Sequence, residues 1–201
     1  NGFSLYVPDP QFSNARASRA VATALFDQFR VFYSESNLPV EDSGIVEDQE
    51  LIAIGSYNTL DPASVLIEYG YIYEPRFLDD AVREKAMKEL AFQTYRGLNR
   101  FFGKYGELFE KYPTTLLPHT WQRPLAQGAG GDPSILSLQA ALLFEALYPP
   151  EGKDKRDCPI SGSFGPCTTL AVQSFQEKYG LPPSGTVGEL TLKKLNEKYG
   201  K

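Results

Sequence analysis

A repeat in the last seventy residues restricts the fold of this chain more than any other sequence feature. The octapeptide SGSFGPCT at positions 161–168 matches SGTVGELT at positions 184–191, 23 residues further on. Each copy is typical of a glycine turn that leads into a helix, and the glycines at 162 and 185 predict backbone with positive φ. Two such copies in tandem predict short helices joined by short loops.

The repeat and the segment before it predict three helices. Gly165 and Pro166 suit the cap and the first position of the middle helix. Apolar residues recur at helical spacing in all three segments: Ile135, Leu138, Ala141, Leu142 and Ala146 in the first, Leu170, Ala171, Val172 and Phe175 in the second, and Leu192, Leu195 and Tyr199 in the third. The sequence therefore predicts a small all-α three-helix domain at 132–201.

A set of paired residues runs through the same domain. They are Leu138-Gln139, Gly162, Phe164-Gly165, Thr168, Ala171-Val172, Phe175-Gln176, Gly180-Leu181, and the closing turn Gly185, Val187-Gly188 and Thr191. In this set the domain resembles the peptidoglycan-binding domain common at the ends of cell-wall hydrolases. The resemblance implies peptidoglycan as the partner. The insertion YPPEGKDKRDCP at 148–159 departs from the family pattern and lengthens the first loop.

Three polar residues of that set are candidate peptidoglycan-binding residues, namely Gln139, Thr168 and Gln176. An equally open role is structural, in which these side chains cap helices or brace the glycine turns.

The two cysteines, Cys158 and Cys167, flank the tight segment 159–166. A disulfide between them would suit an exported protein. The alternative is two unpaired small residues in a loop. Their spacing does not match a paired CxxC zinc site, and no histidine lies near them in sequence.

The first hundred residues predict an α/β layer. Residues 3–7 read as a strand, a helix capped by Ser13 or Asn14 runs to about Phe32, residues 64–72 read as an interior strand, and a helix from Asp79 or Asp80 runs to about Phe102. This alternation predicts a mostly parallel sheet. Two strands make a poor sheet, so further strands are expected, either unrecognised here or on sequence absent from this chain. The five acids in 41–50 predict a solvated loop.

The segment 104–131 differs in composition from its neighbours. Its prolines and its glycine-rich end are typical of a linker. It holds His119 and Trp121, the only His and the only Trp of the chain. We interpret His119 as a surface or packing residue, and Trp121 either as an anchor for the linker or as a platform for a sugar. The predicted domains are 1–103 and 132–201, with the linker between them.

Glu68 lies inside the apolar run VLIEYGY at 65–71. Burial of a carboxylate costs free energy unless the group is paired with a partner, and proteins tolerate that cost where the carboxylate has a functional role. At a strand end beside a cleft, its pKa would rise and suit general acid/base chemistry. The alternative is a side chain that faces solvent or pairs with an arginine.

The same run, together with residues 2–6, 18–25 and 90–102, resembles the C-terminal half of the zinc-dependent N-acetylmuramoyl-L-alanine amidases. The resemblance implies that Glu68 is the catalytic glutamate and zinc the cofactor. The family's zinc ligands, two histidines and a carboxylate, precede the equivalent of residue 2, and His119 lies elsewhere. We therefore expect no amide hydrolysis by this chain alone. The chain is then either a piece of a longer amidase or a degenerate relative that only binds peptidoglycan.

The remaining features concern partners and location. A formal net charge of −5 gives no reason to expect nucleic acid as a partner, and no apolar run approaches the ~20 residues of a membrane span. The chain starts at Asn1 without a secretory signal, which is typical of a mature product or a piece. The expected location is extracellular, in the cell wall or the periplasm. A rival to the hydrolase is a non-catalytic wall-binding or scaffold protein.

Overall fold

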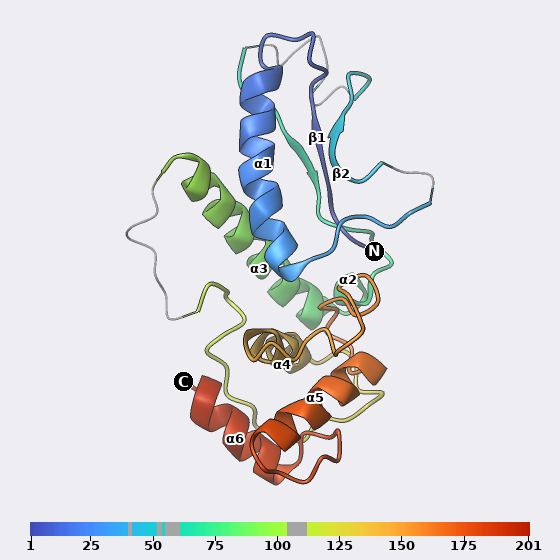
Figure 1. The fold of residues 1–201 in the computed structure, drawn as a ribbon, viewed down its shortest axis with the longest axis vertical. Helices are drawn as coiled ribbons and strands as arrows, with labels where there is room; N and C mark the ends of the chain where they lie inside the picture. Colours follow the sequence, from blue (N-terminus) through green and yellow to red (C-terminus); the bar gives the residue numbers. More distant parts are fainter. Residues whose placement is uncertain (40–41, 52–53, 55–60, 104–111) are drawn as a thin grey trace. The chain divides into compact units, whose positions relative to one another are not determined.

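The computed structural model describes residues 1–39, 42–51, 54, 61–103 and 112–201, and it divides the chain into two compact units (Figure 1). Unit 1 consists of Asn1–Tyr71 and Leu90–Phe109, and unit 2 of Ile72–Glu89 and Glu110–Lys201. Each unit is built from two separate stretches of chain. The units therefore do not follow the predicted boundaries at 103 and 131.

Unit 1 contains a three-stranded sheet in the order β2-β1-β3. The central strand β1 (Ser4–Val7) is parallel to β2 (Gly44–Glu47) and antiparallel to β3 (Leu66–Glu68). The prediction of an α/β unit is confirmed by this arrangement. The prediction of a mostly parallel sheet is wrong, because one of the two pairings is antiparallel.

Strand β2 lies in the acidic segment that the sequence predicts to be a solvated loop, and that prediction is wrong for 44–47. Ile45 pairs with Leu5 and Val46 with Tyr6 in a parallel ladder. Two apolar residues between acids are too few to show the alternation that identifies a strand. Beyond β2, Ile54 is buried, while residues 52–53 lie outside the described part of the chain.

Helix α1 (Ala15–Phe32) covers one face of the sheet (Figure 1). Its bounds confirm the predicted helix, and Asn14 is its N-cap residue. The Asn14 side chain does not cap, however, because its Nδ2 donates to the Pro62 carbonyl at 2.9 Å. The rings of Phe3 and Phe29 meet edge to face at 5.4 Å, which joins β1 to the helix.

Strand β3 is shorter than the predicted strand over 64–72, and it lies at one edge of the described sheet. Gly70 has a φ of +148°, and Ile72 is 88% exposed. The prediction of an interior strand was therefore wrong. The β-branched and aromatic residues that prompted it continue into an exposed segment that precedes α2 (Pro75–Leu78), a short helix that the sequence did not predict.

Helix α3 (Asp80–Phe101) confirms the second predicted helix. Asp79 Oδ1 accepts hydrogen bonds from the backbone of Ala81 and Val82, and Gly103 follows the helix with a φ of +68°. Along this helix Val82, Ala86 and Leu90 are buried, whereas Met87, Tyr95 and Phe101 are exposed. The helix contributes residues 80–89 to unit 2 and the rest to unit 1. Across the part of the chain that the structure describes, no helix has the length and apolar character to cross a membrane.

Unit 2 contains α4 (Pro133–Phe144), α5 (Pro166–Lys178) and α6 (Glu189–Tyr199), which confirms the predicted three helices (Figure 1). Of the predicted apolar residues, Ala146 and Leu170 are exposed and Leu192 is half-buried, whereas the others are buried. The core of the three helices is formed by Ile135, Leu138, Leu142, Phe164, Ala171, Val172, Phe175, Val187 and Leu195.

The linker prediction is wrong for residues 112–131, while 104–111 lie outside the described residues. Leu116, Leu117, Trp121 and Leu125 are each between 2% and 4% exposed, within unit 2. Proline and glycine content alone did not distinguish a solvated linker from an irregular segment packed against helices.

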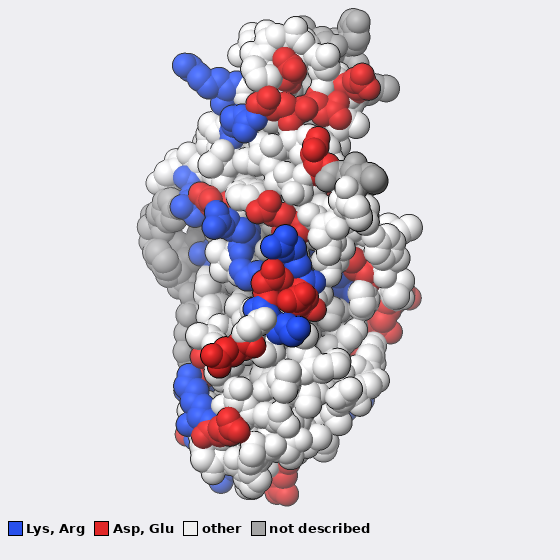
Figure 2. Space-filling model, turned by 45° about the vertical axis from the view of Figure 1, so that its right-hand side comes forward, with Lys and Arg blue, Asp and Glu red and all other residues white. Residues whose placement is uncertain are grey.

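Charged side chains of both signs lie next to one another on the face shown in Figure 2. Exposed ion pairs such as Lys88–Glu84 and Arg156–Asp154 are of this mixed kind. Such a surface differs from the continuous basic face that proteins present to nucleic acid.

Candidate functional site

The two copies of the repeat form two glycine turns, which we call turn 1 (residues 161–165) and turn 2 (residues 184–188). Gly162 has a φ of +73° and Gly185 a φ of +72°, as the sequence predicts. A side chain on either glycine would also collide, because an added Cβ would lie 2.6 Å from Val82 Cγ1 in turn 1 and 2.7 Å from Thr169 Cγ2 in turn 2. Glycine is therefore required at both positions.

Gln139 on α4 braces turn 1 from inside the unit. The residue is 0% exposed, and its Oε1 accepts hydrogen bonds from the backbone of Ser161 and Gly162, both at 3.0 Å. Its Nε2 donates to the Ser163 carbonyl and to Thr168 Oγ1, both at 3.1 Å. One amide thus satisfies three backbone groups of the turn and the hydroxyl at the start of α5.

Gln176 on α5 braces turn 2 in the same way. Its Oε1 accepts from the backbone of Gly185 at 2.9 Å. Its Nε2 donates to the Thr186 carbonyl at 2.7 Å and to Thr191 Oγ1 at 2.9 Å. The sequence repeat is therefore also a repeat of hydrogen bonds, in which a glutamine on one helix holds the turn before the next.

These contacts place all three candidate peptidoglycan-binding residues in the interior, where Gln139, Thr168 and Gln176 are at most 1% exposed. Their polar atoms hold the turns, which is the structural role that the sequence left open. Contact of these side chains with peptidoglycan stays a prediction.

A short stretch of the predicted linker crosses both turns, and we call residues 125–129 the crossing segment. Leu125 exchanges two backbone hydrogen bonds with Val187 in turn 2, at 3.2 and 2.8 Å. Gly128 donates to the Phe164 carbonyl at 2.9 Å, and Phe164 donates to that of Ala129 at 3.0 Å. Phe164 and Val187 are equivalent in the repeat, so the crossing segment joins the two turns at matching positions.

The first half of α3 packs on turn 1 and α4 within unit 2. Val82 contacts Gly162, and Lys85 Nζ donates to Ser137 Oγ at 2.7 Å. Glu89 is fully buried and accepts hydrogen bonds from Thr114 Oγ1 and the Thr115 backbone, both at 2.7 Å. Turn 2 is more open, since Ser184 and Thr186 are exposed.

Trp121 and His119 are packing residues of unit 2. Trp121 is 2% exposed, and its Nε1 donates to the Ser134 carbonyl at 3.0 Å, so the anchoring role is the one observed. The His119 ring stands edge to face on it at 4.8 Å. Burial, helped by the charge of Lys85, lowers the pKa of His119 to about 4, so the imidazole is neutral at neutral pH.

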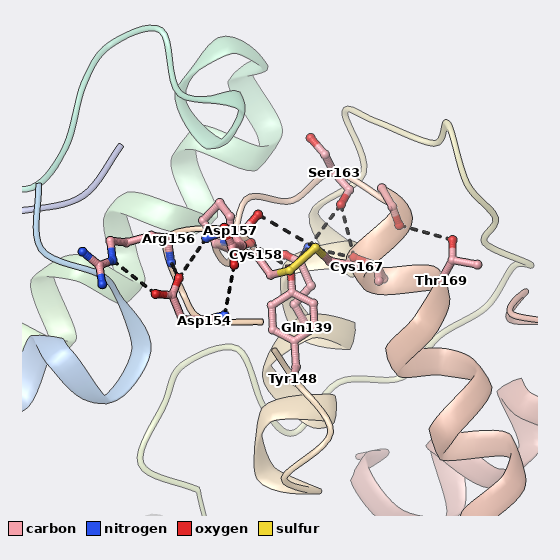
Figure 3. The surroundings of a disulfide bond; sticks show 12 residues. Gln139, Tyr148, Asp154, Arg156, Asp157, Cys158, Ser163, Cys167 and Thr169 are labelled. Atoms are coloured by element: carbon pink, nitrogen blue, oxygen red, sulfur yellow. Dashed lines mark hydrogen bonds and ion pairs between the residues drawn. A yellow bond between two sulfur atoms is a disulfide. The ribbon is translucent and has the colours of Figure 1, made fainter. Parts of the chain in front are cut away.

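The structure joins Cys158 and Cys167 in a disulfide, with their Cα atoms 5.8 Å apart (Figure 3). The bond fastens the end of the 148–159 insertion to the first turn of α5. Tyr148 supports the same loop by donating from its hydroxyl to the Pro159 carbonyl at 2.9 Å. Burial raises the pKa of Tyr148 to about 12, so this hydroxyl remains a donor at neutral pH.

Reduction of this disulfide is expected to lower the free energy of unfolding of unit 2 by about 2–3 kcal/mol, the chain-entropy value for a loop of this length. The measurement is urea unfolding followed by fluorescence of Trp121, with and without a thiol reductant. A Cys158→Ser/Cys167→Ser variant is the control, because its midpoint should match that of the reduced protein and ignore the reductant. An unchanged midpoint in wild-type protein with two titratable thiols would contradict the prediction.

A buried carboxylate ties together the C-terminal ends of the three helices. Glu145, at the end of α4, is 9% exposed. Its Oε2 accepts from Lys178 Nζ at 2.6 Å and Tyr179 Oη at 2.7 Å, and its Oε1 from Tyr199 Oη at 2.6 Å. Lys198 Nζ lies 3.5 Å from Oε1. We call these five residues the Glu145 cluster.

The cluster strongly favours the ionised form of Glu145. Burial by itself would raise the pKa of this carboxyl. The hydrogen bonds from Lys178, Tyr179 and Tyr199, together with the charge of Lys198, outweigh burial and lower the pKa from 4.5 to about 2.

The candidate catalytic residue Glu68 ends strand β3 in unit 1 and is exposed. It lies beside Ser4 in the sheet register, and Tyr6 Oη donates to its Oε2 at 3.4 Å. Within the described ranges no group of three or more His, Cys, Asp or Glu residues is arranged to hold a metal ion. The described residues therefore do not fit the three-ligand zinc site that the amidase resemblance implies.

Comparison with known proteins identifies the family of the helical part. Residues 131–195 match the family model described as "Putative peptidoglycan binding domain". The chain is 38% identical over 77 residues to the zinc D-Ala-D-Ala carboxypeptidase of Streptomyces albus G, a match that covers 38% of this chain and 28% of that protein. It is 42% identical over 72 residues to an uncharacterized protein in the bpoA1 3' region of Kitasatospora aureofaciens, covering 36% of this chain and 54% of that protein.

These matches are partial, because the chain spans 28% and 54% of the lengths of the two curated relatives. No solved structure matches the chain significantly. The family match covers α4, α5 and residues 189–195 of α6, with both braced turns. The chain therefore contains a peptidoglycan-binding domain over residues 131–195.

Proposed function

We propose that this protein attaches to the peptidoglycan of bacterial cell walls through unit 2, outside the cytoplasm in the wall or the periplasm. The observation that carries the proposal is the coincidence of the family match with the braced turns and helices of residues 131–195. The disulfide supports an exported location, since such bonds persist in oxidising compartments.

A finer proposal concerns unit 1. We propose that it is the C-terminal half of the catalytic domain of an N-acetylmuramoyl-L-alanine amidase, with Glu68 as its catalytic carboxylate. The support is the sequence run 65–71, the position of Glu68 at the exposed end of β3, and the attached wall-binding family. Zinc is the family's cofactor, but the described residues do not supply its ligands, and we derive no catalytic step through it. A non-catalytic wall-binding protein with a degenerate unit 1 is the alternative.

One experiment tests both levels of the proposal. The purified chain is mixed with insoluble peptidoglycan, and bound protein, zinc content and release of peptides by amide hydrolysis are measured on the same samples. We expect the chain to sediment with the wall without stoichiometric zinc and without hydrolysis. The control variant Gln122→Ala, which changes an exposed glutamine of unit 2, should sediment equally.

The outcomes separate the readings. Failure to sediment would contradict wall attachment. Stoichiometric zinc with hydrolysis would show that the chain completes a metal site from groups other than those described. If sequence upstream of Asn1 supplies two histidines and a glutamate and restores hydrolysis, unit 1 is part of an amidase. If it does not, the scaffold alternative holds.

A further inference from the structure

Three lysines surround one tyrosine ring on the surface of unit 2. The ammonium nitrogens of Lys178, Lys194 and Lys198 lie 5.8, 5.7 and 4.8 Å from the ring centroid of Tyr179. Their side chains are 44%, 28% and 35% exposed, so solvent reaches all three. The lysines come from the C-terminal end of α5 and from α6, which the Glu145 cluster holds together.

Nearby carboxylates do not cancel this positive charge. Lys178 and Lys198 share Glu145, and Lys194 pairs with Glu197 at 2.7 Å, which leaves one cation in excess among the residues that the structure describes. A lysine has three N–H donors, so each ammonium group has donors left for a ligand. Lys193 and Glu177 are exposed sequence neighbours of opposite sign and do not change the balance. A positive surface stands out in a chain whose net charge is −5.

Aromatic rings adjoin the lysines. Phe144 at the end of α4 is 38% exposed, and its ring lies 6.0 Å from that of Tyr112. The Tyr112 ring in turn lies 5.7 Å from that of Tyr199 in the Glu145 cluster, and its hydroxyl donates to the Lys198 carbonyl at 3.1 Å. These rings connect Lys198 to the C-terminal end of α4 within unit 2.

We propose that the surface formed by Lys178, Tyr179, Lys194 and Lys198 binds the free carboxylates of the peptide stems of peptidoglycan. The inference rests on the proposed function, and it names the peptide stem as the part of peptidoglycan that unit 2 binds. Ammonium groups bind carboxylates through charge-assisted hydrogen bonds. Because these groups are partly exposed, salt should weaken the attraction.

The test compares two double variants that remove equal charge from unit 2. Lys178→Gln/Lys194→Gln changes the surface but leaves Glu145 paired with Lys198 and both tyrosines. Lys88→Gln/Lys153→Gln removes two lysines elsewhere in the unit. Sedimentation with purified peptidoglycan is measured from about 50 to about 500 mM NaCl, and we expect about tenfold weaker binding for the first variant at low salt and less than about twofold for the second.

Two treatments of the wall identify the ligand group. Peptidoglycan whose carboxyls are converted to neutral amides should bind about as weakly as the first variant binds untreated wall. Peptidoglycan stripped of phosphate polymers with hydrofluoric acid should bind fully, and loss of binding there would overturn the carboxylate assignment in favour of phosphate. Trp121 fluorescence reports whether each variant is folded. If Lys178→Gln/Lys194→Gln does not fold, Lys194→Gln alone takes its place in the test, and we expect it to weaken binding about threefold.

Failure of this inference differs from failure of the proposed function. If wild-type protein sediments with peptidoglycan and the two double variants bind alike, the lysine surface is overturned while wall attachment stands. If wild-type protein does not sediment, wall attachment and the lysine surface are overturned together.

Discussion

Replacement of Gln139 by alanine is expected to lower the free energy of unfolding of unit 2 by about 3–4 kcal/mol. The substitution removes the acceptor for the backbone of Ser161 and Gly162 and the donor to the Ser163 carbonyl. Gly162 is buried, and Val82 packs on it, so water cannot easily replace the lost partners. Buried polar groups left without partners are the costliest consequence of such a truncation.

The equivalent change at turn 2 should cost less. Gln176→Ala also removes the side chain that accepts a hydrogen bond from the Gly185 backbone N–H and donates one to the Thr186 carbonyl. Ser184 and Thr186 are exposed, however, so water reaches this turn, and we expect a loss of about 2 kcal/mol. The two repeat copies are thus alike in hydrogen bonding, and we expect them to contribute unequally to the stability of unit 2.

The measurement uses the single tryptophan. Because Trp121 is buried in unit 2, its fluorescence during urea unfolding reports this unit. Gln122→Ala removes an exposed glutamine next to it and should shift stability by less than about 0.5 kcal/mol. Equal losses for Gln139→Ala and Gln122→Ala would show that the brace does not stabilise the turn.

Replacement of Glu145 by glutamine is expected to destabilise unit 2 by about 2–3 kcal/mol at pH 7, and the difference should vanish in acid. The folded pKa of Glu145 is about 2, below the value of 4.5 for the free side chain. Protons therefore bind the unfolded chain more readily. The stabilisation is fully present above about pH 4.5 and is lost as the pH falls to about 2.

The pH series needs a matched control, because other acids also titrate in this range. Glu151→Gln changes an exposed glutamate in the insertion. Its stability should follow that of wild-type protein at every pH, within about 0.5 kcal/mol. If Glu145→Gln runs parallel to wild type between pH 7 and pH 2, the Glu145 cluster does not hold its carboxylate ionised in the way that its contacts indicate.

The longer helices of both units followed from the sequence because their signals are local, whereas the four-residue helix α2 did not. The spacing of Leu138, Ala141 and Leu142 and the proline at 166 depend only on neighbouring residues. The repeat even located the two turns and the sign of φ at Gly162 and Gly185. The roles of Gln139 and Gln176 remained open, because bracing depends on distances across the fold.

The errors in prediction have a common physical cause. Strand β2 is held by its partner β1, and only the two residues Ile45 and Val46 mark it as apolar. The crossing segment has the composition of a linker, yet its backbone pairs with Phe164 and Val187. In both cases the partner is distant in sequence. Local sequence patterns therefore do not predict backbone pairings between residues that are distant in sequence.

The contribution of α3 to unit 2 bears on how such a binding unit can be moved between proteins. A recombinant cassette cut at residue 131, where similarity to the family begins, would retain Gln139, Gln176 and their turns. It would lose Val82, Lys85 and Glu89 as well as the crossing segment. In a fusion with another protein, Gly162 would then be exposed and Ser137 would lose its hydrogen bond from Lys85. A transferable domain would therefore have to include the first half of α3 or another helix that packs in its place.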